Sequence, residues 1–483
     1  MSQKMKTNVT VEEALHGTAP RVDYLTIEER VARGKAARRE VPRSVHAAWE
    51  PPPSRRSPVE LFEAQARTRV PGLVPIRYGR MLVSPFTFYR GAAFVMASDL
   101  ANLPRTGLRT QLCGDAHLSN FGGFAAPDRR LVFSINDFDE TLPGPFEWDV
   151  KRLVASFEVA GRDRGFDDKN RAAINLEAGH AYREAMIGFA EAGNLDLWYR
   201  RIDLEQLLVQ AASVGTAKQL KRAERNVGKA RTKDSLKAFS KLTELVDGEP
   251  RIVNDPPAVT SIEEVVGEEL EAAEHFLRGV IRSYRRTLAG DRRRLLERYR
   301  YVHAARKVVG VGSVGTRAWI MLLLGRDEND PLFLQFKEAE ASVLEPFLGK
   351  SEFANHGQRV VEGQRLIQAA SDIMLGWTRA DDLEGVTRDF YVRQLWDEKV
   401  SALVDVMEPN ALRYYARVCG TELARAHARA GDAVAIAGYL GSSDAFDRAV
   451  AVFAESYANQ NERDYAALKQ AVASGLVKAE TGV

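Results

Sequence analysis

Residues 111–140 read QLCGDAHLSNFGGFAAPDRRLVFSINDFDE, and this stretch decides the fold that we expect. It carries two clusters of polar side chains, separated by a turn signal at 127–129 and an apolar, strand-like run at 131–135. A hairpin of this kind returns the second cluster to the first. We therefore expect their oxygen atoms to meet at one point. The side chains concerned are Asp115, His117, Asn120, Asp137 and Asp139.

The chemistry of these side chains predicts a magnesium-nucleotide site. Mg²⁺ prefers hard oxygen ligands and is usually bound together with substrate phosphates. Asn120 and Asp137 are the expected metal ligands, with Asp139 as a further one. Asp115 is the expected catalytic residue that orients or deprotonates an acceptor hydroxyl. His117 is expected to orient the acidic loop, although a lone histidine is more often structural. The competing interpretation is that these Asp and Asn residues only cap turns.

A second motif lies almost two hundred residues later. Residues 307–324, KVVGVGSVGTRAWIMLLL, have the pattern of a strand, a glycine turn and a strand. Gly310, Gly312 and Gly315 fit G-x-G-x-x-G, with Ser313 inside the turn. A dinucleotide-binding loop would open a helix. Here β-branched and apolar residues follow, which favours a hairpin that covers phosphates as a kinase glycine-rich loop does.

A lysine ends the next apolar run. Residues 332–336 predict a strand, and Lys337 follows it directly. Lysine is rarely buried without a charged partner, and in a kinase-type site such a lysine holds phosphates and pairs with a glutamate of the next helix. We expect Glu362, which lies in the helical pattern 360–373, to be that partner. Other glutamates remain available: Glu338, Glu340, Glu345 and Glu352.

Composition excludes several classes of protein. The chain has 483 residues, 45% hydrophobic and 28% charged, with a formal net charge of +2. These values are ordinary for a globular protein and give no case for a nucleic-acid partner. The two cysteines, Cys113 and Cys419, exclude a disulfide scaffold and favour a reducing, cytoplasmic location. The N-terminal residues lack the apolar core of a secretory signal. The longest apolar run, 318–324, is too short to span a bilayer, so no membrane partner is expected.

GDAHLSNF together with INDFDE resembles the catalytic and metal loops of the aminoglycoside-phosphotransferase and choline-kinase branch of the protein-kinase-like fold. In that branch the motifs are H-G-D-x-H-x-x-N and D-[FW]-[DE]. Cys113 stands where the branch has its first histidine. The other positions match: Gly114, Asp115, His117, Asn120 and Asp137 for the loops, and Gly310, Gly312, Gly315 and Lys337 for the glycine loop and phosphate lysine. The resemblance implies ATP and Mg²⁺ as cofactors.

The order of these parts is inverted relative to ordinary kinases, because the glycine loop and lysine follow the catalytic loop. A circular permutation accounts for this order, and compact domains with neighbouring termini tolerate one. From about residue 30 onward the chain also resembles DUF2252, a bacterial family of unknown function. We expect an α+β, two-lobed, permuted kinase-like fold. Its expected parts are an arm (1–60), the catalytic and metal loops (61–160), a helical segment with a possible acceptor region (161–300), a sheet lobe (301–400) and the helical remainder (401–483).

The expected activity is phosphoryl transfer from ATP to an unknown hydroxyl acceptor, either a small molecule or a protein. Three alternatives remain open. The chain could be a kinase-like nucleotide-binding module that regulates a partner without turnover. It could transfer AMP on the same fold. It could also be a metal-dependent hydrolase using the carboxylates and histidine of 111–140, which would leave Lys337 and the glycine hairpin without a role.

Overall fold

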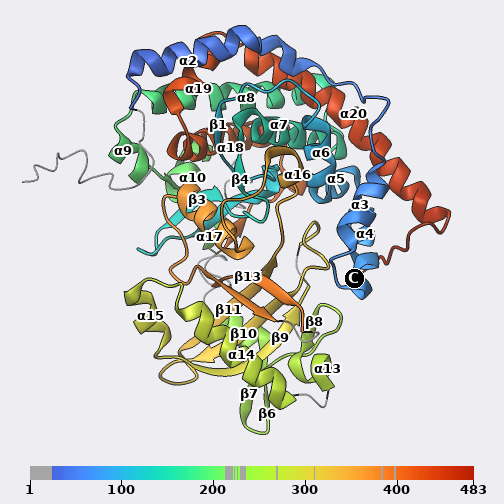
Figure 1. Ribbon diagram of the computed structural model, residues 1–483, viewed down its shortest axis with the longest axis vertical. Coiled ribbons are helices and arrows are strands. Elements are labelled where there is room, and N and C mark those ends of the chain that lie inside the picture. Colours follow the sequence, from blue (N-terminus) through green and yellow to red (C-terminus); the bar gives the residue numbers. More distant parts are fainter. Residues whose placement is uncertain are drawn as a thin grey trace, which may run out of the picture.

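The computed structural model describes residues 24–212, 221, 224–225, 227–228, 235–267, 270–308, 310–381, 385–395 and 399–482. The fold is α+β, as expected, with 53% helix, 17% strand and antiparallel sheets. Figure 1 shows the long helices gathered at one end of the molecule and the largest sheet at the other. The residues of the candidate site come from the region where these two parts meet.

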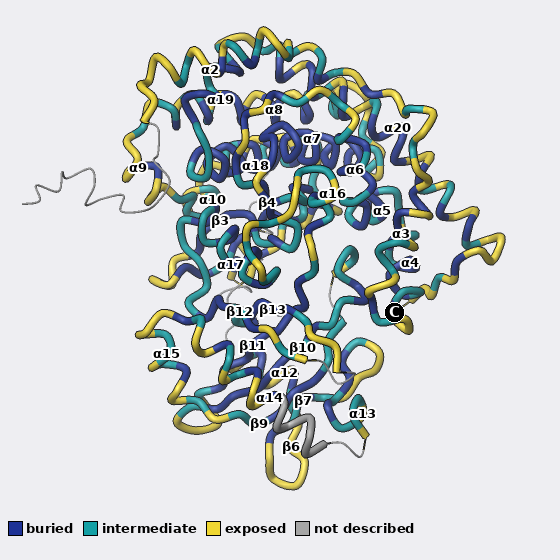
Figure 2. Tube along the Cα trace, in the orientation of Figure 1, coloured by how far each residue is buried: buried dark blue, intermediate teal, exposed yellow. Residues whose placement is uncertain are grey.

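The helical part is built on α7 (Phe146–Asp163), which is buried along almost its whole length. Helices α8 (Asp168–Ala190), α18 (Pro409–Ala430) and α20 (Ala445–Ala473) pack around it. The tube in Figure 2 is dark blue through these central helices and yellow along the outer helices. A helix that is covered on all sides is typical of the centre of a large core.

The outermost helix, α2 (Ile27–Glu40), closes this part. Thr26 begins it with a capping box, because its hydroxyl accepts from the Glu29 N–H while the Glu29 carboxylate accepts from the Thr26 N–H. Helix α2 packs against α19 (Ala433–Leu440). A Cβ at Gly34 would lie 2.0 Å from the Ala435 carbonyl oxygen, so only glycine permits this close approach.

The largest sheet has six antiparallel strands in the order β12-β13-β11-β10-β9-β8. Strands β10 and β11 are central and are buried on both faces apart from Trp319, which is partly buried. Leucine, isoleucine and phenylalanine fill them, as expected for strands that are covered on both faces. The strands are β8 (Val259–Ser261), β9 (Arg300–Lys307), β10 (Ala318–Leu324), β11 (Pro331–Ala339), β12 (Gly376–Asp381) and β13 (Thr387–Gln394).

The stretch 111–140 forms the expected hairpin. Strands β2 (Phe121–Ala125) and β3 (Leu131–Ile135) pair antiparallel, with Phe121 opposite Ile135. Asn120 and Asn136 are therefore neighbours at the open end, where the Asn136 N–H donates to the Asn120 carbonyl oxygen at 2.9 Å. Strands β14 (Val400–Ser401) and β5 (Ile202–Asp203) extend this sheet. β1 (Arg109–Leu112) pairs with β4 (Leu142–Pro145) beside it.

The remaining elements connect or cover these sheets. Helix α17 (His356–Ile367) lies between β11 and β12 in the chain and contacts both β12 and β13. The others are α3 (Pro58–Ala66), α4 (Val74–Met81), α5 (Pro85–Gly91), α6 (Ala93–Leu100), α9 (Asn194–Tyr199), α10 (Leu204–Ala212), α12 (Ser235–Leu242), β6 (Thr243–Val246), β7 (Glu249–Ile252), α13 (Ile262–Val266), α14 (Leu270–Arg285), α15 (Gly290–Leu296) and α16 (Glu345–Leu348).

Local sequence predicts several of these elements well. The buried strand 318–324 is β10, and the glycine turn joins β9 to β10 as expected. The helix expected at 360–373 begins earlier, at His356, and ends at Ile367. Among the described residues, no helix combines the length and apolarity that a bilayer crossing requires. Twelve of the residues 218–241, a range that includes a run of basic residues, are described, and the others lie outside the described residues.

Candidate functional site

The loop that carries Asp115 is held in place by Asp149 of α7. The Asp149 carboxylate accepts hydrogen bonds from the Cys113 N–H at 2.8 Å and the Gly114 N–H at 3.2 Å. It also lies 3.3 Å from Nε2 of His427 on α18. Gly114 has φ +85°, and a Cβ there would lie 2.2 Å from the Glu140 carbonyl oxygen. Glycine is therefore required at this position on both grounds.

Asp115 forms an ion pair with Arg152, also from α7. Arg152 places Nε at 2.9 Å and Nη2 at 2.8 Å from Oδ1 of Asp115. Burial raises the pKa of Asp115, although the Arg152 guanidinium works against this rise. Arg152 is itself fixed by a 2.8 Å hydrogen bond to the Tyr89 carbonyl oxygen. One carboxylate oxygen of Asp115 is thus engaged by arginine, and Oδ2 remains available to a substrate.

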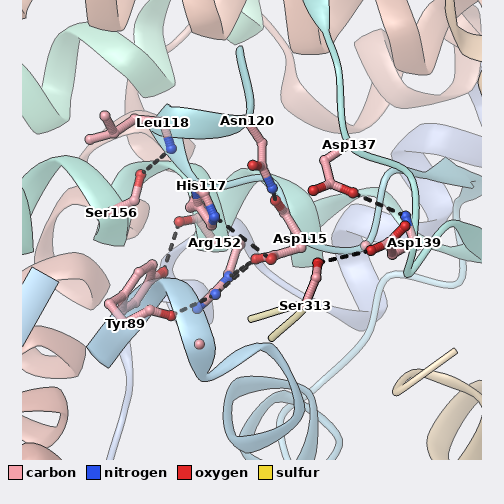
Figure 3. Close-up of polar contacts among 12 residues, drawn as sticks. Tyr89, Asp115, His117, Leu118, Asn120, Asp137, Asp139, Arg152, Ser156 and Ser313 are labelled. Carbon is pink, nitrogen blue, oxygen red and sulfur yellow. Dashed lines mark hydrogen bonds and ion pairs between the residues drawn. The ribbon is translucent and has the colours of Figure 1, made fainter. Parts of the chain in front are cut away.

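His117 has the surroundings of a neutral, structural imidazole. It is 4% exposed, and its Nε2 lies 3.7 Å from Oδ2 of Asp115. Burial, with the charges of Arg90 and Arg152, lowers the pKa of His117 well below its usual value. Figure 3 shows the imidazole directed toward the Asp115 carboxylate. A side chain that stays neutral at physiological pH can orient Asp115 but does not carry a positive charge there.

Asn120 and Asp137 lie next to this loop. The Asn120 amide donates from Nδ2 to the Asp115 carbonyl oxygen at 2.9 Å, which leaves its Oδ1 for other partners. Oδ1 of Asp137 accepts a 3.3 Å hydrogen bond from the Asp139 N–H. Burial raises the pKa of Asp137, and the neighbouring Asp139 charge adds to the rise. Figure 3 draws both side chains beside Asp115 and Asp139.

Lys337 of β11 pairs with Asp139, although 198 residues separate them in the chain. The Asp139 carboxylate also accepts from the Ser313 hydroxyl at 3.2 Å and from the Tyr391 hydroxyl at 2.8 Å. Burial favours the neutral forms of both groups. Their mutual attraction is stronger, so the pKa of Asp139 is lowered and that of Lys337 is raised. The pair therefore carries both charges at neutral pH.

The structure corrects the expected partner of Lys337. Glu362 is a third exposed and pairs with Arg365 of the same helix at 3.2 Å. The buried residue of α17 that reaches the site is Arg359, which donates to the Asp139 carbonyl oxygen at 2.7 Å and to the Thr141 carbonyl oxygen at 2.7 Å. The prediction of Glu362 depends on helical spacing alone, and spacing does not reveal which face of α17 is turned toward β11.

The glycine turn lies against the N-terminal helices. Gly310 and Gly315 have φ of +73° and +94°, which glycine tolerates readily. The Gly315 carbonyl oxygen accepts from the Val70 N–H at 2.8 Å. Arg80 donates to the Gly310 carbonyl oxygen at 2.6 Å. A Cβ at Gly312 would lie 3.3 Å from the Arg90 carbonyl oxygen. The turn is therefore hydrogen-bonded to, and packed against, the segment that contains α4 and α5.

A cavity of about 720 Å³ joins these parts. Asp115, Asp137 and Asp139 line it from the hairpin, and Gly312 and Ser313 line it from the glycine turn. The segment from Glu338 to Val343 forms another wall, directly after Lys337. Further lining comes from α3 to α6, including Arg69, Arg77 and Arg90, and from Glu345, Pro346 and Lys350 at α16 and just after it. A volume of this size accommodates a small-molecule ligand.

The donor set fits a magnesium ion bound partly by phosphate. Among the described residues, no three His, Cys, Asp or Glu side chains form a metal cage. Mg²⁺ is ordinarily held by one or two carboxylates together with substrate phosphates and water, so a cage is not needed. Asp137, with an oxygen that accepts no hydrogen bond from the described residues, suits this role. Asp139 suits it less well, because Lys337, Ser313 and Tyr391 already bond to its carboxylate.

Three residues of the site were not predicted from the sequence. Arg152 pairs with Asp115, Tyr391 bonds to Asp139, and Arg359 holds the backbone around Asp139. Arg152 follows Asp149 by three positions, so the two side chains lie on the same face of a helix. This spacing is a signal in the sequence that both could reach the same loop. No comparable signal marked Tyr391, because its place opposite Lys337 depends on the register of β13 against β11.

Comparison with known proteins gives a family. No curated protein matches the chain significantly, and no solved structure does so either. A family model described as an uncharacterized protein conserved in bacteria matches residues 69–471. This range contains the hairpin loops, the glycine turn, Lys337 and all walls of the cavity except the part formed by residues 64–68. The chain therefore belongs to the DUF2252 family.

Proposed function

We propose that this protein is an ATP- and Mg²⁺-dependent phosphotransferase with a hydroxyl-bearing acceptor. The observation that carries the proposal is the ion pair between Lys337 and Asp139. It brings the glycine turn and the lysine-bearing strand to the same cavity as Asp115 and Asp137. Two motifs that resemble the parts of a kinase site, and that are far apart in the chain, thus share one cavity.

Each residue has a distinct part in the proposed reaction. A bound Mg²⁺ would supply neutralisation of the charge on the transferred phosphate. Asn120 and Asp137 would hold it through Oδ1 and a carboxylate oxygen. The backbone N–H groups of the glycine turn and the Lys337 ammonium would fix the phosphates. Asp115, oriented by Arg152 and His117, would accept a hydrogen bond from the acceptor hydroxyl. Positioning and charge neutralisation supply most of the rate of such a transfer.

The kinase-like fold and its circular permutation are part of the same proposal. Three features support them: the antiparallel sheet, the glycine turn between β9 and β10, and the lysine on the next strand. One feature departs from the pattern. A kinase lysine pairs with a glutamate of the following helix, whereas Lys337 pairs with Asp139 and α17 offers Arg359 instead. We therefore assign to Asp139 the task of holding Lys337.

Calorimetry of Mg-ATP binding tests the proposal. Asp137→Ala should abolish magnesium-dependent ATP binding, because it removes the carboxylate that has an oxygen without a hydrogen bond from the described residues. Asp128→Ala is the matched control, since Asp128 lies on the same hairpin but is half-exposed and pairs with Arg201. The control should bind as the native protein does. Equal Mg-ATP affinity in native protein and Asp137→Ala would refute the metal assignment.

The nature of the transferred group needs a separate experiment. ATP labelled at the γ-phosphate should pass its label to the acceptor if phosphoryl is transferred, and ATP labelled at the α-phosphate should do so if AMP is transferred. A regulatory module without turnover would transfer neither label while binding Mg-ATP normally. Bacterial small-molecule extract supplies the first acceptors to be screened, and Asp115→Asn is the inactive control. Label transfer that persists undiminished in Asp115→Asn would contradict the assigned role of Asp115.

A further inference from the structure

Three arginines, Arg69, Arg77 and Arg90, line the cavity. Arg77 of α4 is 1% exposed, and Arg69, between α3 and α4, is 9% exposed. Arg90 of α5 is partly buried. Arg77 donates from Nη2 to the Gln65 side-chain oxygen at 2.9 Å and to the Gly91 carbonyl oxygen at 3.3 Å. Arg69 donates to the Val314 carbonyl oxygen.

Among the described residues, these guanidinium groups have few hydrogen-bond partners. Within the part of the chain that the structure describes, none of the three has a carboxylate ion-pair partner. Nε of Arg69, Nε and Nη1 of Arg77 and Nε of Arg90 are buried and have no hydrogen-bond partner there. Arginine cannot release its proton under ordinary conditions. A buried charge that is unpaired is strongly unfavourable, so three of them beside one cavity indicate a site for an anion.

Carboxylates also line the cavity, and the charges of Glu340 and Glu140 act on Arg69 and Arg77 without forming an ion pair with either among the described residues. Oε2 of Glu140 accepts a hydrogen bond from the Val343 N–H at 2.7 Å. Three other carboxylates have cationic partners. The pairs are Asp115 with Arg152, Asp139 with Lys337, and Glu338 with Arg317 and Arg388.

The position of the arginines identifies which molecule carries the anion. Arg90 is close enough to Asp115 and Asp137 for their charges to act on it. Asp115 is the residue proposed to meet the acceptor hydroxyl, and it lines the cavity together with the arginines. Gly312 and Ser313, which are proposed to hold the nucleotide phosphates, line the same cavity, so the nucleotide lies beside the acceptor there. The acceptor and the arginines thus share one space.

We infer that the acceptor is itself an anion, a hydroxyl compound bearing a phosphate or similar oxyanion group that Arg69, Arg77 and Arg90 bind. The identification of the anion as the acceptor rests on the proposed function, but the anion site itself can be tested without nucleotide. Arginine forks match phosphate oxygens in a bidentate manner, and hydrogen bonds between two charged groups are the stronger kind. The arginines would fix the acceptor's anionic end while its hydroxyl approaches Asp115.

The experiment titrates inorganic phosphate into the full-length protein and follows binding by calorimetry and thermal shift, at constant ionic strength maintained with chloride. Native protein should bind phosphate, both alone and with saturating Mg²⁺ and a non-hydrolysable ATP analogue. Arg90→Gln should weaken the affinity for phosphate at least tenfold. Arg90→Lys should recover part of that loss because it keeps the positive charge. Arg77→Gln is expected to weaken phosphate binding further. If Arg77→Gln does not fold, the result for Arg90→Gln alone tests the anion site.

Arg67→Gln is the matched control, because Arg67 is exposed and lies two residues from Arg69 but outside the cavity. It should bind phosphate as native protein does. Three results would overturn the inference: no phosphate binding, equal weakening in Arg67→Gln and Arg90→Gln, or competition between phosphate and the ATP analogue. The last would assign the arginines to the nucleotide instead. Failure of the ATP analogue to bind, with phosphate binding intact, would count against the proposed function alone.

Discussion

Separating Lys337 from Asp139 should have a cost that differs between the two partners. Asp139→Asn leaves an ammonium that is 3% exposed without its carboxylate. Breaking a buried pair from one side typically costs about 3–5 kcal/mol, and we expect this variant at the upper end. Lys337→Met leaves Asp139, whose side chain is 25% exposed and still bonds to Tyr391 and Ser313. We expect about 3 kcal/mol for it.

The double variant gives the decisive comparison. Lys337→Met/Asp139→Asn removes both charges, so its destabilisation should be smaller than the sum of the single effects by about 2 kcal/mol, within the usual range for contacting residues. Scaling the typical unfolding entropy to 483 residues converts 1 kcal/mol into a Tm shift of about 1 °C, if the chain unfolds cooperatively. Differential scanning calorimetry resolves such shifts. Single-variant shifts that simply add in the double variant would refute the coupling.

The pH dependence provides an independent check on the pair. The pKa of Asp139 is lowered from 3.8 on folding, so its contribution is present above that value and is lost as pH falls through the lowered pKa. The pKa of Lys337 is raised from 10.5, so its contribution is present below that value and is lost as pH rises through the raised pKa. The difference in Tm between native protein and double variant should therefore be constant from about pH 4 to pH 10. Arg326→Gln, which breaks an exposed pair with Asp327, should leave Tm unchanged and serves as the control.

Three further predictions concern the loop around Asp115. Arg152→Met should leave the buried Asp115 carboxylate without its partner and raise its pKa, which would shift the acidic limb of the pH–rate profile upward; an unmoved limb would argue against the pair. Because the folded-state pKa of Glu140 is raised to about 7, its burial favours the protonated form, and native stability should fall on the order of 3 kcal/mol as pH rises from about 4.5 to above 7. Glu140→Gln should flatten that dependence in denaturant titrations, and a curve that keeps its slope would contradict the assignment. Gly114→Ala should prevent normal folding of the loop, because its Cβ would overlap the Glu140 carbonyl oxygen. Melting followed by circular dichroism tests this, and a variant as stable as native protein would contradict it.

Local pattern was enough to predict the hairpin and the glycine turn. Alternation, turn residues and glycine spacing act over a few positions, so β2, β3 and β10 follow from their own residues. Asp149 lies in the first turn of α7, from where its carboxylate holds the preceding loop around Asp115.

The partners of the charged groups could not be predicted in the same way. Whether Lys337 meets Glu362 or Asp139 depends on how α17 is rotated against β11, and helical spacing leaves that rotation open. An arginine in an apolar segment, such as Arg90, usually pairs with a carboxylate. The structure turns it into the cavity instead. Tertiary packing over hundreds of residues decides such outcomes, and a single sequence carries little information about it.

The long separation between Lys337 and Asp139 has a consequence for synthesis of the protein. At typical rates of 5–20 residues per second, a ribosome takes roughly ten to forty seconds to travel from one to the other. Throughout that interval the nascent chain displays the acidic hairpin without its lysine. A truncated product that stops before β11 therefore retains Asp139 but lacks the Lys337 ammonium that pairs with it, and co-translational folding can complete the cavity only after two thirds of the message has been read.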